Sequence, residues 1–199
     1  MKSPTAATLM FWFISLGGIG LLLPWVQHAS AGLTLNAPEL ATWSIRHGEE
    51  FRGSLVMLTS FLLRGQLLIL AAIASSNVHR SRWFIIVLLC IALLPPPDGF
   101  IRELGNPGYR QLMGLALAAA LISAVGSRLK KPLVAYWQLG WSCIGLLSCL
   151  YVALRIDVLY DSLQLDANAG PGMLCLVFAY ALILMTGLLH GKGRKRQPL

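Results

Sequence analysis

The amino-acid sequence predicts an all-α integral membrane protein, folded as a six-transmembrane-helix bundle. Hydrophobic residues make up 56% of the 199 positions and charged residues only 12%, which is more apolar surface than one soluble core can bury. The apolar residues gather in six long segments, and the charged residues between these segments are strongly sorted by sign. We therefore expect one transmembrane domain, residues 1–199, with the lipid bilayer as its solvent.

Six segments approach the length that a membrane helix needs. A helix must supply about 20 residues, at about 1.5 Å each, to cross a hydrocarbon core of about 30 Å. The runs are continuously apolar rather than alternating, which favours helices over a β-barrel. The expected spans are residues 6–25, 55–74, 83–94, 109–125, 133–154 and 171–190.

The third of these spans is short. It would start at Trp83 and is ended by Pro95, Pro96 and Pro97, which lack the N–H group that a continuing helix requires. From Trp83 to Leu94 it covers only about 17 Å. We therefore expect this helix to stop before it has crossed the membrane, with the proline triplet as a structural element.

The charges orient the bundle. With six spans, the side that holds both termini receives ten basic residues and no acidic ones, whereas the outer loops, 26–54, 95–108 and 155–170, receive all eight acids. Positive charge is retained on the cytoplasmic side, so we expect both termini in the cytoplasm and the protein in the inner (plasma) membrane. The ten basic residues are Lys2, Arg80, Arg82, Arg128, Lys130, Lys131, Lys192, Arg194, Lys195 and Arg196.

The basic tail, residues 191–199, is interpreted first as an orientation signal that contacts anionic lipid, and second as a docking site for a partner. A nucleic-acid partner is not expected despite the net charge of +8, because no basic stripe is interleaved with aromatic residues.

The first segment allows two interpretations. Lys2, an apolar run and the small residues Ala29 to Ala31 resemble a secretory signal that would be cleaved after Ala31. The apolar run is longer than a usual signal core, and Pro24 and Trp25 suit the outer interface of a retained helix. We expect retention; cleavage would leave five spans in the same orientation.

The first outer loop predicts a short interfacial helix. Asn36 and Glu39 have the spacing of a capping box, Pro38 suits the first helical turn, and Gly48 supplies a stop. Trp43 shares a face with the apolar residues and prefers the headgroup region. The helix is expected on the outer leaflet or across the mouth of the bundle, either as a structural element or as a ligand lid.

Arg64 is the main candidate for a binding site. It lies about 15 Å inside the second span, and no acidic residue accompanies it there. A charge at that depth is costly unless it is received by polar groups. We expect its guanidinium, helped by Gln66, to meet the carbonyl groups left unsatisfied at Ile91 to Leu93, or the carboxylate of Asp98.

Two interpretations of this pocket remain open. In the first, Arg64 only pins the interrupted third helix. In the second, Arg64, Gln66, Asp98 and Arg102 bind an anion, a lipid headgroup or a quinone oxygen within the bundle.

No catalytic, metal-binding or cofactor motif is recognisable, so no catalytic residue, metal ligand or cofactor is assigned. The sequence favours a non-catalytic accessory or structural component of a membrane complex, with other membrane subunits as partners. The first alternative is a small transporter or channel-like protein that uses the Arg64 pocket. The second is a membrane enzyme acting on a lipid, for which the outer acids, Arg102 and His47 are the available titratable groups.

Overall fold

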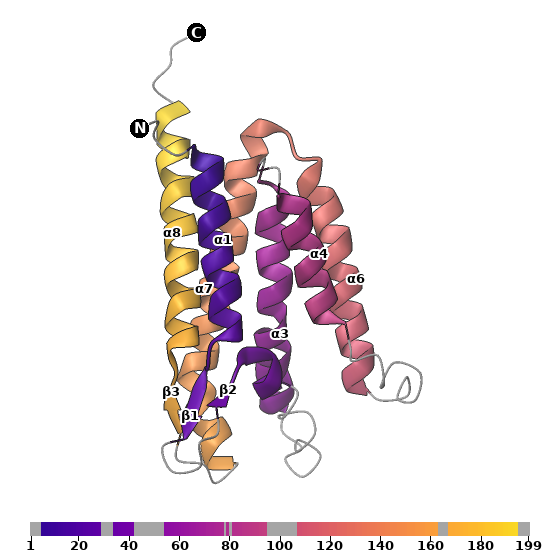
Figure 1. Ribbon diagram of the computed structural model, residues 1–199, viewed down its shortest axis with the longest axis vertical. Coiled ribbons are helices and arrows are strands. Elements are labelled where there is room, and N and C mark those ends of the chain that lie inside the picture. The colour runs from indigo at the N-terminus through magenta and orange to yellow at the C-terminus, as the bar shows by residue number, and fades with distance from the viewer. Residues whose placement is uncertain are drawn as a thin grey trace.

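The computed structural model describes residues 5–28, 34–41, 54–77, 79, 81–94, 107–162 and 167–194. Six helices of this part of the chain run side by side and alternate in direction, so that α1 begins and α8 ends at the same end of the bundle (Figure 1). The helices are α1 (Ala6–Leu22), α3 (Ser54–Ser75), α4 (Arg82–Leu93), α6 (Pro107–Ser127), α7 (Lys131–Ser162) and α8 (Pro171–Arg194).

Four of these helices, α3, α6, α7 and α8, are long and apolar enough to cross a membrane. The other two are also apolar but shorter, with 17 residues in α1 and 12 in α4. The prediction of a helical transmembrane protein is therefore confirmed, with four helices that meet the length of a full span.

The end of α4 agrees with its predicted limit. The helix stops at Leu93, Leu94 is extended, and the Leu94 N–H donates to the Ile91 carbonyl at 3.0 Å. This bond supplies a partner for one of the carbonyls that were expected to be unsatisfied. The proline triplet, Pro95 to Pro97, lies outside the described residues.

The end of α7 differs from its prediction. The helix continues to Ser162, so residues 155–162, expected in the last outer loop, are helical. The reason is local, because this stretch contains neither glycine nor proline and nothing in it stops the helix.

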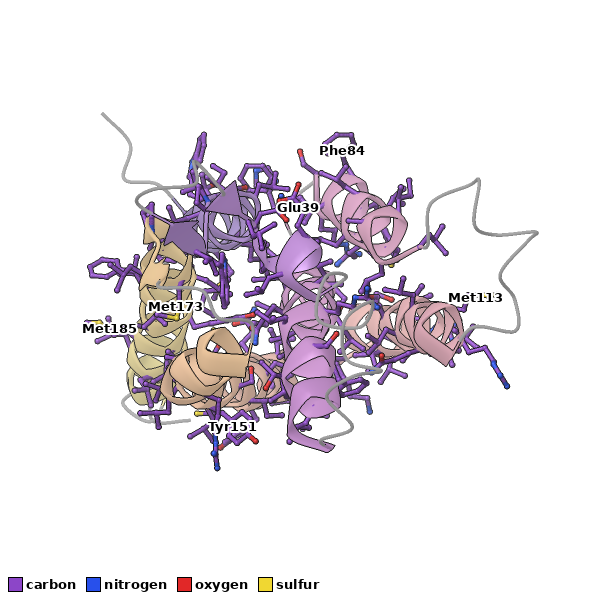
Figure 2. The ribbon with its side chains drawn as sticks, turned by 90° about the horizontal axis from the view of Figure 1, so that it is seen from below. Glu39, Phe84, Met113, Tyr151, Met173 and Met185 are labelled. Atoms are coloured by element: carbon purple, nitrogen blue, oxygen red, sulfur yellow. The ribbon has the colours of Figure 1, made fainter. Side chains whose placement is uncertain are left out.

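Helix α3 lies in the middle of the bundle, between α4 and α6 on one side and α1 and α7 on the other (Figure 2). Within the apolar windows of the spanning helices, 72% of the residues of α3 are buried, against 22% to 33% for α6, α7 and α8. The peripheral helices turn large apolar side chains outward, as Phe84 and Met185 do in Figure 2. An outer surface of large apolar side chains is typical of a bundle solvated by lipid, since a protein in water rarely exposes so much apolar surface.

Three short strands close the end of the bundle opposite to the start of α1, and the sequence analysis did not predict them. They are β1 (Val26–His28), β2 (Thr34–Leu35) and β3 (Ala167–Ala169), paired antiparallel in the order β2-β1-β3. The sheet therefore joins the chain that follows α1 to the chain that precedes α8.

Trp25 is buried beside this sheet, not at the lipid interface where the sequence analysis placed it. Its side chain is fully buried, and its indole N–H donates to the Gly20 carbonyl at 2.9 Å. The backbone around it is also paired, because the Trp25 carbonyl accepts from Gly170 N–H at 2.7 Å.

The predicted capping box is present. The Glu39 N–H donates to Asn36 Oδ1 at 2.9 Å, and the Asn36 N–H donates to Glu39 Oε2 at 3.1 Å. Residues 37–41 are helical, and Leu40 and Ala41 are fully buried. The Ala41 carbonyl accepts from the Ser60 hydroxyl of α3 at 2.9 Å, so this segment packs onto the bundle. Trp43 and Gly48 lie outside the described residues.

Glycines let α1 and α8 come into close contact. A Cβ atom at Gly20 would lie 2.9 Å from the Gly172 carbonyl oxygen and 2.9 Å from the Leu176 nitrogen, both of which are backbone atoms. At Gly18, two residues earlier in the same helix, a Cβ atom would meet nothing within 4 Å. Close packing of α1 against α8 is thus present at Gly20 and not at Gly18.

We expect Gly20→Ala and Gly18→Ala to change stability in opposite directions. Gly20→Ala must push two backbones apart and should lower the free energy of unfolding by about 1–3 kcal/mol. Gly18→Ala only improves helix propensity and should raise it by about 0.5–1 kcal/mol. Melting curves of the two variants in detergent micelles measure the difference; equal shifts would contradict the packing of α1 on α8.

Candidate functional site

Arg64 is buried in α3, as expected, with 5% of its surface exposed. It is the eleventh of the 22 residues of the helix, roughly 16 Å from the Ser75 end. It shares a helix face with Ala71 and Ser75, seven and eleven residues further on. The Ala71 carbonyl accepts from the Ser123 hydroxyl of α6 at 3.4 Å, which places this face of α3 toward α6.

The partner region predicted for Arg64 is only partly described. Helix α4 does pack against α3, which is the arrangement that the hypothesis requires. Asp98 and Arg102 lie outside the described residues, and the Ile91 carbonyl accepts one bond from the Leu94 N–H and keeps a second lone pair. The contact between Arg64 and the chain that follows α4 therefore stays a prediction.

Gln66 belongs to another part of the bundle. Gln66 follows Arg64 by two positions, so the two side chains are offset by roughly 200° around the helix. The Gln66 side chain is fully buried and its amide nitrogen donates to the Ser148 hydroxyl of α7. Its amide oxygen accepts from the Tyr180 hydroxyl of α8 at 2.8 Å. Gln66 thus has its own partners on α7 and α8, and the structure separates it from the site predicted around Arg64.

The Gln66 network is continued on α7. The Ser148 hydroxyl also donates to the Gly145 carbonyl at 3.0 Å, one turn earlier in its own helix. The Tyr180 ring lies directly over Gly145, where an added Cβ would come within 2.6 Å of the ring. The hydrogen bonds of Gln66 with Ser148 and Tyr180 thereby connect α3, α7 and α8.

The Ser75 end of α3, where the chain turns toward α4, carries a second set of polar contacts. The Trp137 indole N–H donates to the Ala72 carbonyl at 2.8 Å, and the Gln138 amide donates to the Ser76 hydroxyl at 3.2 Å. The Asn77 amide donates to the Ala7 carbonyl at 3.1 Å. These bonds connect α3 to α7 and α1, so this polar cluster is devoted to helix packing.

Ser148 and Tyr180 were not predicted from the sequence as partners of Gln66. The available signal was that both are polar residues inside otherwise apolar spans, where each hydroxyl needs a partner within the protein. What the sequence lacked was the rotation of each helix, since the pairs are separated by 82 and 114 residues.

Comparisons of the chain with protein-family models, with curated proteins and with solved structures find no match. Among the described residues, no group of three or more His, Cys, Asp or Glu side chains is arranged to hold a metal ion. The interpretation of the site therefore rests on the contacts given above.

We expect Tyr180→Phe and Gln66→Leu to be coupled. In a double-mutant cycle their interaction should amount to about 0.6–1.7 kcal/mol, the range measured for interhelical hydrogen bonds in membranes. Thermal unfolding of the two single variants and the double variant in detergent micelles gives this value.

The matched control pairs Tyr180→Phe with Ser15→Ala. The Ser15 hydroxyl donates to the Phe11 carbonyl of its own helix at 2.9 Å and makes no bridge to α8. The effects of this pair should add. A coupling as large as that of Tyr180 with Gln66 would contradict the assigned hydrogen bond.

Proposed function

We propose that this chain is a non-catalytic component of a larger membrane complex, an accessory or structural subunit with six spans. Both termini would be cytoplasmic, in the inner (plasma) membrane. Support for this orientation comes from the sorting of charge, with ten basic residues and no acids on the side of the termini. Support for six spans comes from α1 and α4, which lie alongside the four longer helices rather than across them (Figure 1). The short α4 would be accommodated by local thinning of the bilayer.

The observation that carries the proposal is the use made of the polar side chains of α3. Ser60 and Gln66 of α3, and Asn77 two residues beyond its end, all bond to neighbouring segments of the protein. A transport path or an active site needs polar groups that face a cavity, whereas these groups face other helices. A bundle whose buried polar side chains bond to neighbouring helices is best suited to a structural role.

Co-purification tests the proposal directly. The full chain with an affinity tag at its C-terminus, extracted from its native membrane in a mild detergent, should bring other membrane proteins with it in fixed ratio. Mass photometry should give a particle well above that of one 21.7 kDa chain in its micelle. The control is an untagged strain processed identically. A lone monomer that retains its fold would contradict the proposal.

A transporter or channel-like protein with an anion, lipid or quinone pocket is the second candidate, favoured by the burial of Arg64 at mid-depth. A lipid-modifying enzyme is the third and would need titratable groups that converge at an interface. The outer acids that could serve lie largely outside the described residues.

Water access to position 64 separates the first two candidates. On a background without native cysteines, Arg64→Cys should resist a charged thiol reagent added to either side of the membrane, because the position is buried. Arg128→Cys, at an exposed position at the end of α6, is the control and should be modified. Modification of position 64 at a comparable rate would favour the transporter.

A further inference from the structure

A groove runs along the outside of the bundle between α4 and α6. Its volume is about 650 Å³, and several side chains that line it, including Val87, Ile91 and Leu117, are more than half exposed. Most of its wall is aliphatic, from Ile86, Val87, Ile91 and Leu94 on α4 to Ala116 and other residues of α6. The groove therefore lies where the surrounding lipid would meet the protein.

A row of small side chains on α6 lines the groove. Ala116, Ala120 and Ala124 follow one another at intervals of one helical turn, and Met113 and Leu117 are the larger α6 side chains beside them. The α4 wall opposite is built from larger residues, including Val87 and Ile91, which are more than half exposed. The groove therefore has bulky side chains on its α4 side and a row of methyl groups on its α6 side.

The groove is polar at one end only. Trp83, Ser127 and Arg128 line the end near the inner turns of the bundle. Leu94 and Met113 line the opposite end, where the wall is apolar. Arg128 is exposed, and the Ser127 hydroxyl is engaged with the Ala124 carbonyl at 2.8 Å. The positive charge at this end thus comes from Arg128, beside a tryptophan of the kind that sits at headgroup level.

The length of the groove corresponds to one leaflet. From Trp83 to Leu94 the wall extends for eleven residues of α4, about 17 Å. Half of a hydrocarbon core of about 30 Å is about 15 Å. A transmembrane helix from a partner or a second copy would cross both leaflets and is about 10 Å wide, whereas the described lining of this groove ends at Leu94 on the α4 side.

We propose that the groove binds one anionic phospholipid from the leaflet on the Arg128 side. One of its two acyl chains would lie against Ala116, Ala120 and Ala124, and its phosphate would accept hydrogen bonds from the Arg128 guanidinium, a group whose planar donors match phosphate oxygens. The site differs from the lipid contact predicted for the basic tail, because it combines a headgroup position with a shaped apolar channel. It does not depend on partner subunits, so a single chain should show it.

The test uses the purified full chain in nanodiscs of equimolar phosphatidylglycerol and phosphatidylcholine. Native mass spectrometry after release should show phosphatidylglycerol retained in preference to phosphatidylcholine. Arg128→Gln should weaken this retention by about fivefold, as expected for one basic residue at an anionic surface. Lys130→Gln makes the same charge change at an exposed residue that does not line the groove, and it should have little effect.

Filling the groove provides the second arm. Ala120→Phe should reduce retention of both lipids, whereas Leu121→Phe introduces the same ring one position away, at a residue outside the groove, and should not. A phosphatidylglycerol with a photoreactive group at the end of its chain should cross-link near Leu94 and Met113.

Three outcomes would overturn the proposal. Equal losses for Arg128→Gln and Lys130→Gln would indicate general surface charge, and cross-links spread over all helices would indicate ordinary lipid contact. A dimer that Ala120→Phe abolishes would identify a second copy as the occupant. These results leave co-purification with other subunits unaffected, so the lipid site and the proposed function fail independently.

Discussion

Every polar group that α3 carries into the bilayer must find its partner inside the protein, and this requirement organises the bundle. Lipid offers no hydrogen bonds, so an unsatisfied amide or hydroxyl costs several kcal/mol at that depth. Gln66 is satisfied by α7 and α8, and the Ala71 and Ala72 carbonyls receive second donors from Ser123 of α6 and Trp137 of α7. A helix with such contacts in several directions has to be surrounded, which is why α3 is the most buried of the spans.

The peripheral helices are held by a different kind of contact. Between two helices in lipid the hydrophobic effect contributes little, since the tails are as apolar as leucine, and association depends on close packing and hydrogen bonds. Gly20 and Gly172 let the backbones of α1 and α8 touch, and Gly126 lets α6 approach Ser75 and Trp137. The β1–β3 pairing then joins the segment after α1 to the segment before α8, at the end of the bundle where the two helices meet the sheet.

The sequence predicted the features that one segment determines alone. The positions of the helices follow from apolar length, the end of α4 from the prolines after Leu94, and the Asn36–Glu39 capping box from its spacing. It failed where the outcome depends on segments far apart. Strands of two or three residues carry no readable alternation, Trp25 is buried because β1 and α8 cover it, and the partners of Gln66 depend on how α7 and α8 are rotated.

The opposed directions of Arg64 and Gln66 explain why the fold needs the hairpin of α4 and α6. A bundle of α1, α3, α7 and α8 would satisfy Gln66 and leave the face of Arg64, Ala71 and Ser75 against lipid. No rotation of α3 corrects this, because the two side chains are offset by roughly 200° around the helix. Turning one of them inward therefore turns the other outward. Only helices on both sides enclose both groups. The α4–α6 pair therefore covers the side of α3 that carries Arg64, although α4 has only 12 residues.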